Sequence, residues 1–496
     1  MSTFPYRNIV IAGGGTAGWM TGAAFSKLLG KEVNVTLIEA DDIPTVGVGE
    51  ATIPSLHVFH DLLKINESEF MKATGATFKL GIQFENWLEK NTSYLHSFGY
   101  LGKGCWAAGF QHFWLRGKRV GISEEIGDYC VEHLACRTSR FATAPGQPRN
   151  YAYHLDATKY AVFLKKMALA NGLHHISEKI TGVNLSKTDG AIASVSLSDN
   201  RTVSGDLFID CTGFRGLLIE QALHTGYEDW GHWLPMNSAV VAQTALSDTC
   251  TVPYTRAIAH DAGWRWKIPL QTRAGNGMVY CDKFFSDDDA KTTFTEMLSS
   301  TPVTTPRILK FKTGTRRKHW NKNCIAIGLS SGFIEPLEST SIHLIQQSII
   351  RLLQLIPTSE NFTHNQALFN QRMRFETENI RDFIVLHYHA TQREDTEFWR
   401  YCKRMEIPDS LQRRMALFNS SGHVYKQDEE LFGEDSWLQV MLGQGLYPDS
   451  YHPIADSMPE SELASFLGSI HAHVKRQVNQ FPHHTDFIDQ YAKSES

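Results

Sequence analysis

A glycine-rich turn near the start of the chain constrains its fold more than any other feature. The apolar run 8–12 indicates a short strand, Gly-Gly-Gly-Thr-Ala-Gly follows at 13–18, and helix-forming residues continue to about Leu29. A second apolar run, 33–39, ends in Glu39. A strand, a glycine turn, a helix and a strand that ends in an acidic residue are typical of a Rossmann-type dinucleotide-binding unit.

Each glycine of this turn has a physical role in such a unit. Gly13 permits the tight turn, Gly15 lets a pyrophosphate approach the backbone, and Gly18 lets the helix pack closely on the strand. The start of the helix, at Thr16 and Ala17, offers backbone N–H groups and the positive end of the helix dipole to the phosphates. The alternative is a glycine-rich turn without a ligand, but the β-α-β order favours a dinucleotide site.

The choice between FAD and NAD rests on a second motif. The chain has only one such fingerprint, and the stretch 206–213, Asp-Leu-Phe-Ile-Asp-Cys-Thr-Gly, resembles the second flavin-side motif of FAD-dependent monooxygenases. We therefore expect bound FAD and no resident NAD(P)H site. The fold class predicted is α/β, an FAD-binding Rossmann-like fold of the flavin monooxygenase type with a mixed sheet.

Composition excludes several classes of protein and of binding partner. The chain is 42% hydrophobic and 20% charged, enough for a sizeable core, and its net charge of −5 advertises no basic surface for nucleic acid or membrane lipid. No apolar run is long enough to span a membrane, and no signal-peptide pattern precedes the first strand, so a cytoplasmic protein is expected. The eight cysteines contain no CxxC pair, which argues against a disulfide scaffold or zinc ribbon.

The periodicity further along the chain predicts two parts. Residues 77–85 alternate as in a half-buried strand that leaves Lys79 on the solvent face, 264–268 alternate again, and 342–356 carry a helical stripe. Beyond about residue 360 the pattern is mostly helical. We expect an FAD-binding and halide-binding module over 1–360, with inserted substrate-side segments at about 96–150, and a helical substrate-covering region over 361–496.

Three stretches identify a family. Gly-Trp-Arg-Trp-Lys-Ile-Pro at 263–269 resembles the Trp-x-Trp-x-Ile-Pro signature of the flavin-dependent tryptophan halogenases. Val-Gly-Val-Gly-Glu-Ala-Thr-Ile-Pro at 46–54 and Gly-Ala-Thr-Phe-Lys at 75–79 are similar to early motifs of that family, and 328–341 is similar to its catalytic-glutamate and halide segment. The resemblance covers nearly the whole chain.

The resemblance implies a role for residues that have plainer readings by themselves. Lys79, otherwise a solvated strand lysine, becomes the catalytic amine that directs hypohalous acid or forms a haloamine. Glu338, otherwise an acid that stabilises a helix start, becomes the base that removes the ring proton. Trp264 and Trp266, otherwise core aromatics, lie beside the flavin and keep ordinary substrates away from it.

Ligand-binding residues complete this set. Chloride or bromide is predicted to bind at the helix start formed by Thr340 and Ser341, a position where the family often has Gly in place of Ser341. The residues predicted to bind the cofactor are Gly13, Gly15, Thr16, Ala17, Gly18, Glu39, Ala51, Leu329 and Ile342.

The substrate end keeps one half of the family pattern. His96, Phe98 and Trp437 match the ring sandwich that holds an indole, although a generic aromatic core is the alternative. Lys426 and Phe432 stand where the family strap has a tyrosine and the glutamate for the amino acid's charges. Because each missing charge-assisted hydrogen bond is worth roughly 1.5–3 kcal/mol, indole or a larger substituted indole is favoured over free tryptophan.

The prediction is therefore a two-component FAD-dependent halogenase with a small aromatic substrate. It uses a separate flavin reductase as its partner and is compatible with a homodimer. A hydroxylase that uses NAD(P)H directly and a non-catalytic flavin-binding protein are the alternatives. No metal is expected: His387-Tyr-His389 and His471-Ala-His473 place paired histidines on predicted strands, without a third ligand at metal-site spacing.

Overall fold

The computed structural model describes residues 6–30, 32–40, 50–144, 146–246, 251–359, 361–427 and 429–494. Residues 46–49 of the early family motif at 46–54 lie outside these ranges.

A parallel sheet near the N-terminus forms the nucleotide-binding part, and the order of its strands is β20-β21-β12-β1-β2-β8. Its strands are β1 (Asn8–Ala12), β2 (Asn34–Glu39), β8 (His174–Ser177), β12 (Leu207–Asp210), β20 (Trp320–Asn321) and β21 (Cys324–Ala326). All neighbouring pairs are parallel except β20 with β21. Helix α1 (Thr16–Leu28) connects β1 to β2 and packs on α6 (Ala157–Ala170). This arrangement confirms the predicted Rossmann-like α/β fold.

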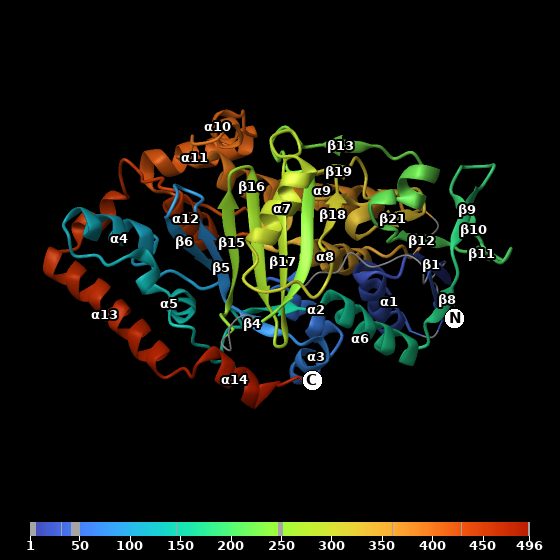
Figure 1. Ribbon diagram of the computed structural model, residues 1–496, viewed down its shortest axis with the longest axis horizontal. Coiled ribbons are helices and arrows are strands. Elements are labelled where there is room, and N and C mark those ends of the chain that lie inside the picture. Colours follow the sequence, from blue (N-terminus) through green and yellow to red (C-terminus); the bar gives the residue numbers. More distant parts are fainter. Residues whose placement is uncertain are drawn as a thin grey trace.

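A larger, mostly antiparallel sheet stands in the middle of the molecule (Figure 1), with strand order β18-β14-β17-β16-β15-β5-β6. Its strands are β5 (Gly81–Glu85), β6 (Ser93–Ser97), β14 (Ser238–Ala245), β15 (Tyr254–His260), β16 (Gly263–Pro269), β17 (Arg273–Tyr280) and β18 (Arg307–Lys310). Only β15 and β5 run parallel among its pairs in the described ranges. The sheet carries the two signature tryptophans on β16 and leads through β5 and β6 toward the helical region.

The remaining strands of the described residues form three small sheets. They consist of β3 (Glu50–Ala51), β7 (Ala152–Leu155) and β4 (Thr77–Lys79); of β13 (Tyr227–Asp229), β19 (Gly314–Arg316) and β22 (Gly332–Phe333); and of β11 (Thr202–Ser204), β10 (Ile192–Leu197) and β9 (Ile180–Leu185). The first of them links the nucleotide-binding part to the central sheet, because β4 and β5 are separated by a single residue, Leu80.

The C-terminal part is helical, as predicted, and most of its helices lie along the upper, left and lower edges of the view in Figure 1. The remaining helices are α2 (Leu56–Leu62), α3 (Glu67–Thr74), α4 (Phe110–Arg119), α5 (Val131–Arg137), α7 (Asp287–Glu296), α8 (Ser341–Gln354), α9 (Thr363–His389), α10 (Glu397–Arg404), α11 (Asp409–Ser421), α12 (Glu434–Gly443), α13 (Glu460–Asn479) and α14 (His484–Tyr491). The expected boundary near 360 falls between α8 and α9, and one buried cluster contains residues from both sides of it.

Two sequence expectations are wrong. Residues 77–85 form two short strands, and the face expected in solvent is covered: Thr77 and Lys79 are fully buried because β7 pairs with β4 and the 338–340 turn approaches from another side. The histidine pairs do not lie on strands. His387 and His389 end helix α9, and His471 and His473 lie in α13.

Candidate active site

The glycine turn is tightly packed at two of its glycines and open at a third. Gly13 adopts φ +104°, and a Cβ there would lie 2.3 Å from the Cys211 carbonyl oxygen. A Cβ on Gly18 would lie 1.9 Å from the Gly13 oxygen, so helix and strand are in close contact. Beside Gly15, in contrast, no described atom lies within 4 Å of a Cβ position. This open space at the start of α1, where Thr16 and Ala17 begin the helix, fits a dinucleotide phosphate group.

Glu39 is the last residue of β2 and lies beside this turn. Its carboxylate accepts hydrogen bonds from Lys165 Nζ at 2.7 Å and Trp19 Nε1 at 3.2 Å, and it pairs with His175 Nε2 at 2.9 Å. A Cβ on Gly14 would lie only 1.7 Å from Glu39 Oε2, so the carboxylate covers the turn directly. The predicted ribose ligand is therefore placed beside the turn and already held in position by three partners.

The other predicted cofactor residues come from three separate elements. Ala51 lies in β3 and Ile342 in the first turn of α8, both buried. Leu329 lies in the 3₁₀ turn Gly328–Ser330, where a Cβ on Gly328 would be 2.8 Å from Ala17 Cβ. That close approach brings the 328–330 turn against the start of α1, which places Leu329 near the nucleotide turn.

Lys79 is fully buried at the end of β4. Its ammonium donates to the Thr52 carbonyl oxygen at 3.0 Å and to Ser339 Oγ at 2.7 Å, and it lies 5.2 Å from the centroid of the Phe98 ring. Burial lowers the pKa of Lys79 to about 7, although the negative charge of Glu338 opposes this shift. A substantial fraction of the side chain is therefore a neutral amine at neutral pH, and a neutral amine is nucleophilic.

Glu338 ends the 3₁₀ helix Pro336–Glu338 and is also fully buried. His96 Nδ1 lies 2.9 Å from Glu338 Oε2, and His387 Nε2 lies 2.9 Å from Oε1. Burial by itself raises the pKa of Glu338, but the two histidines outweigh it and lower the pKa to about 2. The carboxylate is therefore ionised at any ordinary pH and is ready to accept a proton.

His387 extends this pair into a chain of buried groups. Burial lowers the pKa of His387, and its Nε2 lies at ion-pair distance, 2.9 Å, from Glu338 Oε1. Its Nδ1 then accepts the hydroxyl proton of Tyr94 at 2.7 Å. The Phe84 ring stacks on both, with centroids 4.5 Å from His387 and 4.9 Å from Tyr94. Tyr94, His387, Glu338 and His96 thus form one continuous row of buried polar groups.

The predicted halide residues follow Glu338 directly. Ser339 adopts a left-handed conformation with φ 59°, and Thr340 is the N-cap residue of α8. Within the described ranges no side chain caps this helix, and the buried Thr340 Oγ1 has no hydrogen-bond partner. The first N–H groups of α8, at Ser341 and Ile342, and an unpaired hydroxyl therefore converge beside the acceptor of Lys79, which suits a small anion.

Trp264 and Trp266 project from the same face of β16, as the alternation predicts. Their ring centroids are 5.7 Å apart and both side chains are buried. Trp266 lies over Gly277 of β17, where a Cβ would come within 2.0 Å of the indole, so a larger residue there would displace the ring.

The three predicted substrate residues are only partly together. His96, at the end of β6, and the adjacent Phe98 have ring centroids 6.4 Å apart. Trp437 lies on α12, on the far side of Phe383, whose ring is 5.5 Å from His96 and 4.8 Å from Trp437. Gln439 joins the two elements, because its Oε1 accepts the backbone N–H of Ser97 at 2.9 Å. The sequence does not predict Phe383, His387 or Tyr94 as part of the site.

Two kinds of feature are absent from the described part of the chain. Among the described residues, no group of three His, Cys, Asp or Glu side chains is arranged to hold a metal ion. No helix in the same ranges has the length and apolar character needed to cross a membrane.

Comparison with solved structures gives the class of protein. The chain superposes on Xcc4156, a flavin-dependent halogenase from Xanthomonas campestris, with a TM-score of 0.97, 50% identity and 99% coverage of both chains. BrvH, a flavin-dependent halogenase from Brevundimonas sp. BAL3, gives a TM-score of 0.93 and 40% identity, with 98% of this chain and 99% of that chain covered. With its glycine turn and buried lysine–carboxylate site, the molecule is a flavin-dependent halogenase.

Sequence comparison gives the family. The tryptophan halogenase family model matches residues 8–460. The tryptophan 7-halogenase RebH of Lentzea aerocolonigenes is 33% identical over 97% of this chain and 98% of its own length. The chain therefore belongs to the tryptophan halogenase family, which confirms the resemblance inferred from residues 46–54, 75–79, 263–269 and 328–341.

Proposed function

We propose that this halogenase attaches chloride or bromide to an indole-like aromatic ring, with Lys79 directing the halogen and Glu338 accepting the ring proton. The observation that carries the proposal is the 338–339 segment: Glu338 is buried between two histidines while the next residue, Ser339, accepts a hydrogen bond from Lys79 at 2.7 Å. An amine with a pKa of about 7 and an ionised carboxylate thus share one water-poor site.

FAD, reduced by a separate flavin reductase, supplies hypohalous acid from oxygen and a halide when it is bound. The residues that fit it are the glycine turn at 13–18, with open space beside Gly15, and the adjoining carboxylate of Glu39. The start of α8 at Thr340 and Ser341 would hold the halide. Trp264 and Trp266 are buried neighbours that exclude water and bulky molecules from the interior.

Lys79 keeps the oxidant from diffusing freely. Its amine either hydrogen-bonds hypohalous acid or is halogenated on nitrogen with release of water, and both routes present an electrophilic halogen at a fixed atom. Fixation comes from the two acceptors of Lys79, the Thr52 carbonyl and Ser339 Oγ. The Phe98 ring is a neighbour of both groups, with its centroid 5.2 Å from the amine and 6.4 Å from the His96 ring.

Glu338 completes the substitution. When the ring carbon bonds the halogen, the bond from the halogen to oxygen breaks in the hydrogen-bonded route, and the bond to the Lys79 nitrogen breaks in the haloamine route. The oxygen or nitrogen left behind takes up a proton, and the ring's own proton passes to the Glu338 carboxylate. The net change is replacement of one ring hydrogen by halogen with formation of water. His96, through a hydrogen bond at 2.9 Å, and His387, at an ion-pair distance of 2.9 Å, hold the carboxylate in place, so that it needs no reorientation during the reaction.

An uncharged ring suits the substrate end better than a zwitterion. Phe432 is buried near His96 at the position where the family strap has its glutamate, and Lys426 replaces a tyrosine. A free amino acid would lose water around two charges with few partners to replace it. We therefore infer indole or a substituted indole as the substrate class.

The test is product analysis with a matched pair of lysine variants. The purified protein, a flavin reductase, FAD, NADH, bromide or chloride and a panel of indoles are incubated and analysed by mass spectrometry. Lys79→Ala is expected to bind FAD and reoxidise it without halogenated product, whereas Lys72→Ala, which changes an exposed lysine of α3, retains activity. Wild-type rates from Lys79→Ala would remove Lys79 from the mechanism.

The same assay separates the alternatives. A hydroxylase predicts an oxygenated product and NADH consumption without added reductase. A flavin-binding protein without catalysis predicts no product with any halide.

A further inference from the structure

An aromatic side chain occupies the space in which the substrate ring is expected. Phe432, in the connection between α11 and α12, is only 7% exposed. Its ring stacks on Phe383 with centroids 3.8 Å apart and planes inclined by 18°. The same Phe432 ring lies 6.3 Å from His96. This stacked contact is the geometry that a bound indole would adopt on an aromatic wall.

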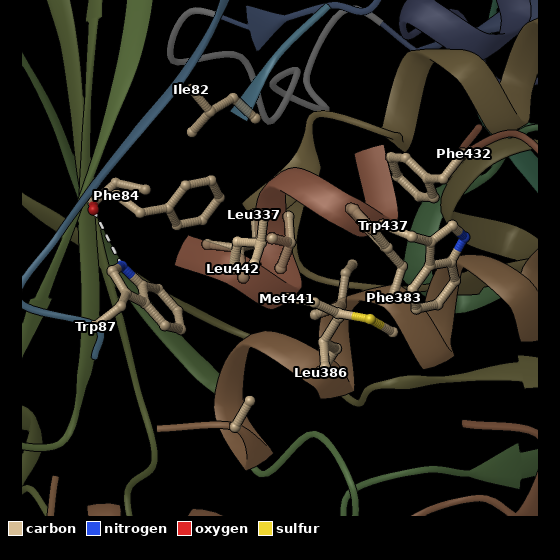
Figure 2. Close-up of a cluster of buried hydrophobic side chains, with 14 of the residues drawn as sticks. Ile82, Phe84, Trp87, Leu337, Phe383, Leu386, Phe432, Trp437, Met441 and Leu442 are labelled. Atoms are coloured by element: carbon tan, nitrogen blue, oxygen red, sulfur yellow. Dashed lines mark hydrogen bonds between the residues drawn. The ribbon is translucent and has the colours of Figure 1, made fainter. Parts of the chain in front are cut away.

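The rest of the wall is rigid. Phe383 lies in the middle of α9 and packs edge-on against Trp437 of α12, at 4.8 Å and 85°. Figure 2 shows Phe432, Phe383 and Trp437 together at one side of the buried cluster, with Phe84 and Trp87 at the other. Phe383 and Trp437 are fixed by helices on both sides, whereas Phe432 belongs to neither a helix nor a strand.

The connection is anchored by polar contacts close to Phe432, whose own ring is held by stacking on Phe383. Arg414 of α11 donates to Glu430 Oε1 at 2.6 Å and to the Tyr425 carbonyl oxygen at 2.6 Å. On the other side, Gly433 begins α12, and no described atom lies within 4 Å of its Cβ position. The open space beside Gly433 leaves room for a movement of the short segment between the Glu430 anchor and Gly433.

We propose that Phe432 is a gate that stands in for the substrate ring: it stacks on Phe383 while the site is empty and swings out when an indole-like ring takes its place. The inference rests on the proposed function, because it assumes that the ring binds between His96 and Phe383. Phe432 is then a residue that determines specificity. It lowers the affinity for molecules that stack weakly, because they cannot displace the Phe432 ring. Flat, electron-rich rings can displace it and bind.

The gate has a measurable consequence. Only the open fraction of the protein binds substrate, so the apparent dissociation constant is the intrinsic one divided by that fraction. Removal of the Phe432 ring abolishes the stacked competitor, and indole affinity should rise by about three- to tenfold, the scale of one aromatic stacking contact. The catalytic constant should stay unchanged, because the hydrogen bonds that hold Lys79 and Glu338 go to Ser339 and His96 and do not involve Phe432.

Direct binding and steady-state kinetics test this with the full-length protein loaded with FAD. The dissociation constant for indole is measured by calorimetry for the wild type, Phe432→Ala, Phe432→Leu and Phe466→Ala, and KM and kcat for indole bromination are measured in parallel. Phe466→Ala is the matched control, because Phe466 is a partly buried ring of the same cluster that packs on Phe113. Phe432→Leu fills the volume without a flat ring and serves if the alanine variant does not fold.

The gate predicts a lower dissociation constant and a lower KM for both Phe432 variants, with kcat retained and no change for Phe466→Ala. Weaker indole binding by the Phe432 variants would show that the ring is a wall of the occupied site. Unchanged binding would show that the Phe432 ring does not compete with indole. Either result overturns the gate, and so does the absence of indole binding by all four proteins. Tighter binding without halogenated product from the wild type would instead refute the proposed function and leave the gate standing.

Discussion

Because its amine is buried, Lys79 is expected to lower the stability of the folded state. Its pKa falls from 10.5 to about 7 because the amine lies in the interior. Each tenfold change in proton affinity is worth about 1.4 kcal/mol, so the folded state loses about 5 kcal/mol relative to the unfolded chain when both are protonated, below about pH 7. Replacement by methionine, which needs no proton, removes this cost.

The sign of the pH dependence follows from the same numbers. The folded state binds the lysine proton more weakly than the unfolded chain, so the cost is complete below pH 7 and disappears as the pH rises toward 10.5. Lys79→Met also leaves the Thr52 carbonyl and Ser339 Oγ without a donor, at about 1–3 kcal/mol each, but that loss does not change with pH. The advantage of the variant should therefore shrink by about 3 kcal/mol between pH 6 and pH 9.

Urea unfolding of both proteins at four pH values between 6 and 9 measures this difference. The exposed Lys72→Met variant, whose lysine lies on the surface of α3, should follow the wild type at every pH. A stability difference between Lys79→Met and the wild type that stays constant over this range would refute the reasoning, because it would mean that Lys79 is protonated in the folded protein throughout.

Three further predictions concern the reaction. Glu338→Gln should slow halogenation by about 10²-fold, the scale of one general base, with FAD binding unchanged in a fluorescence titration; loss of both folding and FAD affinity would make Glu338 a structural residue. His387→Phe removes the polar neighbour that lies 2.9 Å from Glu338 Oε1, so the pKa of Glu338 should rise and the acid limb of the pH–rate profile should move to higher pH; an unmoved limb would contradict this. In one-pot competition, indole should be halogenated in preference to tryptophan, and the reverse order would mean that residues elsewhere bind the charges.

The parts of the site that were predictable are those whose chemistry is local. The turn at 13–18 is a contiguous set of glycines whose steric roles can be read from the strand and helix that flank it. The structure agrees in detail, since Gly13 and Gly18 leave no room for a Cβ and Gly15 leaves open space. Likewise Trp264 and Trp266 share a face because alternation within a strand does not depend on distant contacts.

Burial that distant segments impose was not predictable from periodicity. Lys79 alternates with apolar neighbours as a solvent-facing residue would, yet β7 and the turn after Glu338 cover it from both sides. The place of His387 in the site was missed for a different reason. A three-residue His-Tyr-His pattern has no usable period, and only the long helix α9 turns its first histidine toward Glu338 and carries Phe383 four residues earlier.

The residue that joins these parts is Ser339, and its backbone explains how one short segment serves three functions. A non-glycine residue at φ 59° costs about 1–3 kcal/mol, and this conformation reverses the chain between the 3₁₀ helix that ends at Glu338 and the helix that begins after Thr340. Without the reversal, Glu338 would not face His96 while Ser339 Oγ faces Lys79. The strain is therefore the structural cost of placing the Glu338 carboxylate, the Ser339 hydroxyl that accepts from Lys79 and the start of α8 within three consecutive residues.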